Sequence, residues 1–219
     1  MRVVDLSHPL RGGMTVFPGD PEVRVEPAVT IAEAGVSVLS LELGSHTGTH
    51  VDAPSHTVEG GATIDAVDLG RLIGPALVVD VNGLPPRTRI RAEDVRDALR
   101  EVEPGTIVLF RTGWSALFDE PGYLDHPFLD AGVASALLDA GVTVVGVDAL
   151  NPDETPRDDP APSLPFHDVF LGAGGLIIEN LTGLDRITAS APQFVGLPLP
   201  IAGRDGAPLR AVVVEDDAE

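Results

Sequence analysis

The order of apolar segments between residues 76 and 147 constrains the fold more than any other feature of the chain. Apolar runs at Ala76–Val81, Thr106–Phe110 and Val142–Val147 are separated by two stretches with helical periodicity, Ala92–Val102 and Ala131–Ala140. Strands that alternate with helices are typical of crossovers between parallel strands. We therefore expect parallel strands covered by helices in this part of the chain.

The two helical stretches carry apolar residues at helical spacing. In the first, the stripe consists of Val95, Leu99 and Val102. In the second, Asp130 precedes the apolar stripe as the N-cap and Gly141 follows it as the stop. Both stretches are predicted to be helices with one face against the sheet.

Further strands are predicted outside this region. The segment Ser37–Leu43 alternates, with its leucines on one face, and strands are also expected at Arg2–Leu6, Leu176–Glu179 and Arg210–Val214. Glycine and proline are spread through the N-terminal third, which favours antiparallel hairpins there. The sequence thus predicts an α/β fold with a mixed sheet and flanking helices, in a single domain over residues 1–219.

Composition excludes several classes of function. The chain has no cysteine, so disulfides and thiolate metal sites are excluded, and any metal must be held by His, Asp or Glu. Its formal net charge of −20 disfavours nucleic acid and anionic membranes as partners. The start of the chain carries Asp5 where a signal peptide needs an apolar run, and no stretch has the length of a membrane span. We expect a cytoplasmic protein that acts on a small molecule.

A histidine cluster marks the candidate site. His46, His50 and His56 fall within eleven residues and are accompanied by Asp52. A helix is unfavourable here because the segment contains glycine, β-branched residues and Pro54. Three histidines and an aspartate in such a short segment indicate a metal site.

An extended chain would place these four side chains on one face, since all four positions are even-numbered. A straight strand would nevertheless separate His46 and His50 by roughly 13 Å, at about 3.3 Å per residue. Nitrogen ligands lie about 2 Å from a zinc ion, so the two imidazoles could not share it. The backbone must therefore curl between them, and Gly48 is the residue that permits this.

The run His46-Thr47-Gly48-Thr49-His50-Val51-Asp52-Ala53-Pro54-Ser55-His56 strongly resembles the signature of the cyclase family, which includes bacterial kynurenine formamidases (arylformamidases) and isatin hydrolases. Shorter matches follow the order of the family along almost the whole chain: Phe17-Pro18-Gly19-Asp20, Arg111-Thr112-Gly113-Trp114, Val145-Gly146-Val147-Asp148 and Ile177-Ile178-Glu179-Asn180-Leu181. The resemblance implies a swivelling β/β/α fold and a homodimer or homotetramer.

The resemblance also implies two metal ions per chain, zinc or manganese. By matching positions, the first ion is bound by His46, His50 and Asp52. Asp52 also reaches the second ion, which His167 binds, and Glu179 bridges both. His56 is then the general acid/base.

This set of residues suits hydrolysis of an amide. A metal-activated hydroxide would attack the carbonyl, one ion would stabilise the oxyanion, and His56 would pass a proton to the leaving amine. The first candidate substrate is an N-formyl arylamine such as N-formylkynurenine, cleaved to the free amine and formate. The alternatives are ring opening of a cyclic amide of the isatin type, and a metal-stabilised binding protein without turnover. His56 argues against the binding protein without turnover, because a purely structural metal site needs no further histidine beside its ligands.

Several other residues have candidate roles in the site or the core. Glu179 follows two isoleucines and is expected to end a buried strand, where its carboxylate needs a partner. Phe17 is predicted to form an aromatic wall of the substrate pocket, where kynurenine formamidases of the family usually have Trp. Trp114 is assigned equally to the pocket or the core, and Asp148 equally to the site or a cap. His8 and His126 lie beside prolines and are left unassigned.

Overall fold

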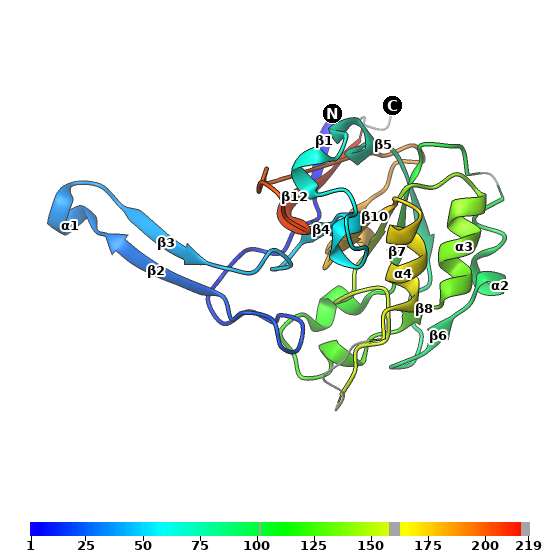
Figure 1. Cartoon of the computed structure of the whole chain (residues 1–219), viewed down its shortest axis with the longest axis horizontal. Coiled ribbons are helices and arrows are strands. Elements are labelled where there is room, and N and C mark those ends of the chain that lie inside the picture. Colours follow the sequence, from blue (N-terminus) through cyan, green and yellow to red (C-terminus); the bar gives the residue numbers. More distant parts are fainter. Residues whose placement is uncertain (101, 158–162, 216–219) are drawn as a thin grey trace.

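A mixed, barrel-like sheet forms the body of the molecule. The computed structural model describes residues 1–100, 102–157 and 163–215. Eight strands follow one another in the order β1-β12-β11-β5-β7-β9-β10-β4, and β4 also pairs with β12, which closes the sheet on itself (Figure 1). The strands are β1 (Arg2–Asp5), β4 (His50–Asp52), β5 (Ile73–Asp80), β7 (Ile107–Arg111), β9 (Val144–Val147), β10 (Leu176–Glu179), β11 (Gln193–Pro198) and β12 (Gly206–Glu215).

Strands β5, β7, β9 and β10 are parallel, as the alternation of apolar runs and helices predicts. The side chains of β7, β9 and β10 are buried on both faces, which explains their nearly continuous apolar sequence, whereas β5 is partly exposed. In β7, Ile107 and Leu109 join the core that also contains residues of β1, β4, β11 and β12. Val108 and Phe110 point the other way and pack with residues of the helices. The predicted α/β class with a mixed sheet is confirmed.

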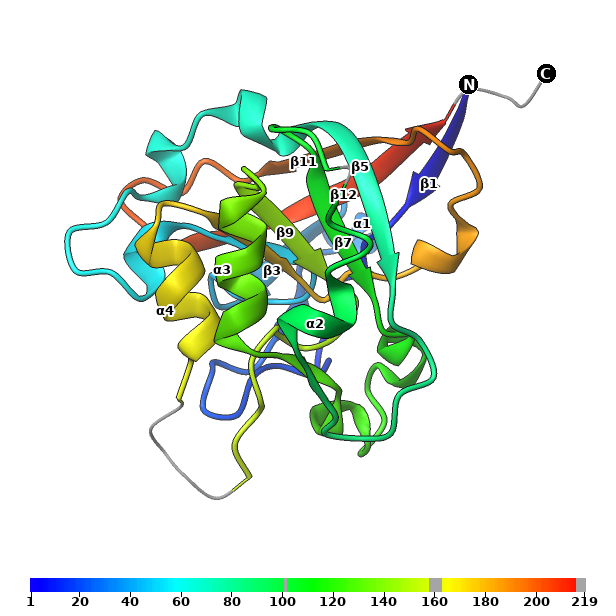
Figure 2. The same ribbon diagram turned by 90° about the vertical axis from the view of Figure 1, so that its right-hand side faces the viewer.

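Two helices, α3 (Ala131–Asp139) and α4 (Pro165–Gly172), lie side by side over the outer face of the parallel strands (Figure 2). The predicted ends of α3 are confirmed. The Asp130 carboxylate accepts a hydrogen bond from the backbone N–H of Val133 at 3.1 Å, and Gly141 follows the helix with a φ of 78°. These ends orient α3 across the sheet.

The predicted helix at Ala92–Val102 is wrong beyond its first turn. Helix α2 spans only Ala92–Val95, and residue 101 lies outside the described part of the chain. Between residues 92 and 100 only Val95 and Leu99 are buried, so the apolar face is narrower than a stable surface helix needs. The chain continues in turns, with the N–H of Arg100 donating to the carbonyl of Asp97 at 3.4 Å.

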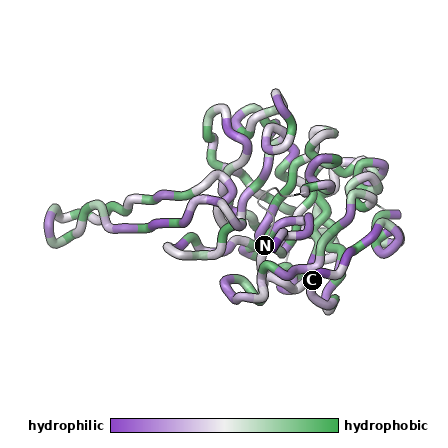
Figure 3. The backbone as a smooth tube through the Cα atoms, turned by 60° about the horizontal axis from the view of Figure 1, so that its bottom comes forward, coloured by the Kyte–Doolittle hydropathy of each residue, from purple (hydrophilic) through white to green (hydrophobic). Residues whose placement is uncertain are grey.

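An antiparallel hairpin extends far from the body (Figure 1). It consists of β2 (Arg24–Val29), the short helix α1 (Ile31–Ala34) and β3 (Val38–Glu42), and residues 24–42 are called the arm below. The predicted strand at Ser37–Leu43 and the predicted hairpin are confirmed. Every residue of β3 is nevertheless exposed, and apolar and polar residues alternate along the arm (Figure 3).

The remaining elements are short. Strands β6 (Arg89–Ile90) and β8 (Phe128–Leu129) form a parallel pair. Single 3₁₀ turns occur at Pro54–His56, Ile64–Ala66, Leu69–Leu72, Trp114–Leu117, Tyr123–Asp125 and Leu184–Arg186. Among the described residues, no helix has the length and apolar character needed to cross a membrane.

Candidate metal centre

Strand β4 places two of the predicted ligands on the same side of the sheet. His50 and Asp52 alternate with Val51, whose side chain enters the core. Before the strand, Gly48 adopts a φ of +63°, which reverses the chain as expected. The imidazole of His46 consequently lies with its ring centroid 5.1 Å from that of His50.

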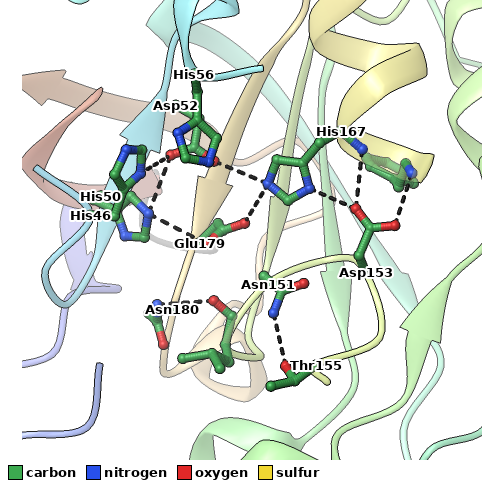
Figure 4. A network of polar contacts seen from close by, with 12 residues as sticks. His46, His50, Asp52, His56, Asn151, Asp153, Thr155, His167, Glu179 and Asn180 are labelled. Carbon is green, nitrogen blue, oxygen red and sulfur yellow. Dashed lines mark hydrogen bonds and ion pairs between the residues drawn. The ribbon is translucent and has the colours of Figure 1, made fainter. Parts of the chain in front are cut away.

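Strand β10 and helix α4 bring two more predicted ligands to the same place. Glu179 pairs with His50 across the two strands, and α4 carries His167. His167 Nε2 lies 3.1 Å from Glu179 Oε1 and 3.4 Å from Asp52 Oδ2. His50 Nε2 lies 3.3 Å from Asp52 Oδ1 and 3.4 Å from Glu179 Oε2. Each carboxylate therefore spans both imidazoles (Figure 4).

The Nδ1 atoms of His50 and His167 each form a hydrogen bond with another group of the protein. His50 Nδ1 donates to the carbonyl oxygen of Gly48 at 2.8 Å. His167 Nδ1 lies 2.6 Å from Asp153 Oδ2, which can only accept when ionised. Both Nε2 atoms are thereby directed to the carboxylates. This arrangement is typical of metal-binding histidines, whose second nitrogen is fixed by an acceptor.

The donor set fits a divalent cation. Within the described residues, His50 Nε2, Asp52 Oδ2 and Glu179 Oε1 are buried and lack a partner with hydrogen-bond geometry. The ligand atoms of His46, His50 and Asp52 lie within 4.8 Å of one another, as do those of Asp52, His56 and His167. Buried carboxylates are costly unless a cation compensates them. Nitrogen and oxygen ligands of this kind suit a divalent metal ion such as zinc or manganese.

The buried carboxylates raise the pKa of the neighbouring imidazoles. Burial alone would lower the pKa of His50, but the charges of Asp52 and Glu179 outweigh it and raise that pKa to about 9. For His46, burial also opposes Asp52 and Asp205, and the pKa rises to about 10. The pKa of Asp52 stays well below its usual range because the imidazoles outweigh its desolvation.

His56 lies beside the cluster at the end of the 3₁₀ turn Pro54–His56. Its ring centroid is 4.0 Å from that of His46 and 5.7 Å from that of His167. Its Nδ1 is 3.4 Å from Asp205 Oδ2, and the same oxygen lies 2.9 Å from His46 Nε2. Asp205 lies in the loop before β12, and no local spacing in the sequence indicates it.

Comparison with known proteins agrees with this geometry. The Cyclase family model matches residues 4–154. The chain belongs to the cyclase family. The family inferred from the histidine motif is therefore confirmed.

Individual cyclase-family proteins align over nearly the whole chain. A kynurenine formamidase of Salinibacter ruber is 36% identical over 218 residues, 97% of each protein. A solved structure described as a potential metal-dependent hydrolase with cyclase activity has a TM-score of 0.79 at 31% identity and covers 99% of both chains. An isatin hydrolase bound to thioisatinate has a TM-score of 0.88 and covers 98% of this chain and 92% of its own. At 23% identity, this last likeness concerns the fold alone.

The cluster of histidines and carboxylates opens into a cavity that is partly lined by apolar side chains. Phe17, Leu150 and Leu164 line it together with the imidazoles, Asn151 and Asn180. Phe17 begins a type II turn, in which the N–H of Asp20 donates to the Phe17 carbonyl at 3.0 Å and Gly19 has a φ of 100°. The structure thus places Phe17 on the wall of the cavity, where an aromatic pocket residue was expected.

Trp114 and Asp148 do not line this cavity. Trp114 is buried in a small core, and its Nε1 donates to the carbonyl of Tyr123 at 3.0 Å. The Asp148 carboxylate accepts from the N–H groups of Thr112 and Gly113 at 2.7 and 3.0 Å, and burial raises the pKa of Asp148. For Trp114 the structure favours the core. The partners of Asp148 precede the 3₁₀ turn Trp114–Leu117, whose N-cap is Gly113 without a side-chain cap, so Asp148 neither lines the cavity nor caps a helix.

The remaining histidines are also outside the cluster. His8 stacks on Phe118 with ring centroids 3.8 Å apart, and burial lowers the pKa of His8 to about 4. His126 is buried against Thr155, and burial lowers its pKa.

Sequence reasoning did not assign the residues that support the ligands. Asn180 directly follows Glu179 with a φ of +54° and accepts a hydrogen bond from Tyr123 Oη at 2.8 Å. Its amide also donates to the carbonyl of Leu150 at 3.1 Å, so the end of β10 is fixed. Asp153 could have been found, because polar residues after the carboxyl end of a parallel strand often belong to a site.

Proposed function

We propose that this cyclase-family chain is a metal-dependent hydrolase of N-formyl arylamines such as N-formylkynurenine, which it cleaves to the free amine and formate. The observation that carries the proposal is the pair of buried carboxylates, Asp52 and Glu179, each of which faces both His50 and His167 at 3.1 to 3.4 Å. The similarity to kynurenine formamidases over nearly the full length supports this choice of substrate.

We propose that the same carboxylates hold two zinc or manganese ions per chain. His46, His50 and Asp52 would hold one ion, His167 and Asp52 would hold the other, and Glu179 would bridge both. When bound, such a pair polarises the carbonyl and lowers the pKa of water toward neutrality.

The chain's own side chains then position the substrate and move protons. His56 lies at the edge of the cluster and lines the cavity, where it can give a proton to the leaving amine. Asp205 orients the His56 ring through Nδ1. Phe17 and Leu150 offer apolar surface to the aryl ring and exclude water from one side of the cavity.

Absorbance assays with N-formylkynurenine and isatin test this function. The metal-loaded wild type should hydrolyse the formamide faster than the cyclic amide. His56→Ala should lower the rate by about 10²–10⁴-fold, which is typical for loss of a general acid/base. Metal analysis should find the ions retained. Loss of metal in His56→Ala would make His56 a ligand, and turnover of isatin alone would replace the proposed substrate.

We also propose that the arm joins copies of this chain into a homodimer or homotetramer. Leu39 pairs with Pro27 and Leu41 with Val25, so these side chains form one apolar face of the hairpin. Leu39 and Leu41 are 55% and 57% exposed. Between residues 27 and 41 the only charged residue is Glu33, whereas the chain as a whole repels itself with a net charge of −20.

Sedimentation velocity tests this assembly. The wild type should sediment as an oligomer, and Leu39→Ser with Leu41→Ser should shift it toward the monomer. Leu69→Ser is the matched control, because Leu69 is 50% exposed on the body. A wild type that is monomeric at micromolar concentration would contradict the proposal. A cytoplasmic location remains a prediction from the sequence.

A further inference from the structure

Asn151 is a buried polar residue on the wall of the cavity, and the proposed mechanism gives it no role. It lies beyond the end of β9, is 2% exposed and lines the cavity together with His56 and Glu179. Its Oδ1 is buried and has no hydrogen-bond partner among the described residues. A buried amide oxygen without a partner destabilises a protein, so we expect a hydrogen-bond donor to bind at Asn151 Oδ1.

The orientation of the Asn151 amide follows from a chain of hydrogen bonds. His126 Nδ1 lies 2.9 Å from the carbonyl oxygen of Pro127, which can only accept, so Nδ1 carries a proton. Burial lowers the pKa of His126, which keeps the ring neutral and leaves Nε2 as an acceptor. Nε2 lies 2.8 Å from Thr155 Oγ1, so the hydroxyl donates to it.

The Thr155 hydroxyl has thereby used its single proton, and its oxygen can only accept from Asn151. The Asn151 amide nitrogen donates to it at 3.0 Å (Figure 4). If the amide oxygen and nitrogen of Asn151 were exchanged, Asn151 Oδ1 and Thr155 Oγ1 would face each other as two acceptors. Oδ1 is therefore the amide atom left for a ligand, and His126, a buried histidine that is not one of the proposed metal ligands, fixes this choice.

We infer that Asn151 Oδ1 accepts a hydrogen bond from the N–H of the scissile secondary amide. The inference rests on the proposed function and adds a specificity residue to it. A secondary amide has one N–H beside the bond that breaks, and that N–H needs an acceptor once the substrate is desolvated. A neutral amide oxygen can supply it without competing for the cation, as a further carboxylate would.

Two substrates that differ in this N–H test the inference. Formanilide has the N–H, whereas phenyl formate has an ester oxygen in its place. Asn151→Ala should lower kcat/KM for formanilide about tenfold, the size expected of one hydrogen bond, and should change kcat/KM for phenyl formate less than threefold. Metal content per chain should equal that of the wild type.

Two further variants separate hydrogen bonding from packing. Thr155 is the hydrogen-bond partner of the Asn151 amide. Thr155→Val should therefore lower kcat/KM less than Asn151→Ala does, and for formanilide only. Leu150→Ala changes the apolar wall and should affect both substrates alike. Equal losses on both substrates in Asn151→Ala would overturn the inference and leave the proposed function standing. A metal-loaded wild type that hydrolyses neither substrate would overturn both.

Discussion

The arm and the metal centre both depend on short strands, yet their surroundings are opposite. Strand β3 in the arm pairs with one neighbour and exposes all five residues, whereas β4 pairs with two neighbours and buries all three. In β4 the side chains have fixed partners, and in the arm Leu39 and Leu41 face solvent. The difference indicates that the body holds the ligands rigidly and that the arm is available for contact with another molecule.

The largest effect is expected at the centre of the cluster. Asp52→Ala removes the carboxylate that faces three imidazoles and should abolish both metal binding and turnover. Metal analysis and the formamide assay measure the two losses. Asp139→Ala, at the exposed end of α3, is the control and should behave like the wild type. Activity retained in Asp52→Ala would remove the basis for the proposed function.

A smaller loss of metal binding is expected when a residue that is hydrogen-bonded to a ligand is changed. Asp153→Asn keeps an acceptor for the N–H of Phe166 at the start of α4 but removes the oxygen and the charge beside the backbone N–H and Nδ1 of His167. Metal affinity should fall about 10- to 100-fold, as is typical for residues that orient a ligand. Competition with a chelator measures it, and Asp168→Asn on the exposed side of α4 is the control. Unchanged affinity would mean that the carboxylate does not orient the ring.

The pH dependence of the metal-free protein should be a further effect of the cluster. His46 and His50 have folded pKa values near 10 and 9, above their ordinary value of 6.5. Their stabilising contribution is therefore complete below pH 6.5 and is lost as the pH rises through 9 and 10. Melting temperatures with a chelator present should fall between pH 6 and pH 9.

Two comparisons isolate that pH effect from general charge repulsion. His50→Gln should show a shallower fall, because one of the histidines with a raised pKa is removed. With metal present the trend should reverse, since the ion displaces these protons and binds more tightly as they dissociate. A metal-free melting temperature that rises toward pH 9 would contradict the raised pKa values.

The smallest effect is expected in the arm. In the monomeric fraction, Leu39→Ser with Leu41→Ser should leave metal content unchanged and alter the free energy of unfolding by no more than about 0.5 kcal/mol, because both side chains are exposed. Urea denaturation and metal analysis measure these quantities. Loss of metal would show that the arm also supports the cluster and that the two regions are not independent.

Local patterns in the sequence predicted the parts of the fold that rest on local causes. The apolar runs of β7, β9 and β10 and the caps of α3 are properties of neighbouring residues, and each was found. The helix expected at Ala92–Val102 failed because periodicity alone does not show how much of a face is covered by other elements. The strand in the arm was found, but its exposure depends on what lies around it.

The same distinction applies to the site. His46, His50 and Asp52 could be grouped from their spacing and from Gly48, whereas His167 was placed by family resemblance. The structure brings all of them together with His56 and Glu179. Asp205 and Asn151 were not found, because only the closed sheet and the loops around it bring them near the cluster.

Strand β4 is three residues long and yet joins β10 to β12, so the barrel is closed through the strand that carries His50 and Asp52, which would hold the ion. Backbone amides at this seam are shielded from solvent as long as β4 stays in register. We expect their exchange with deuterated water to slow when metal is added and to quicken on chelation, in β10 and β12 as well as in β4. Occupancy of the site would then be measurable by hydrogen exchange in β12, a strand that carries no ligand of its own.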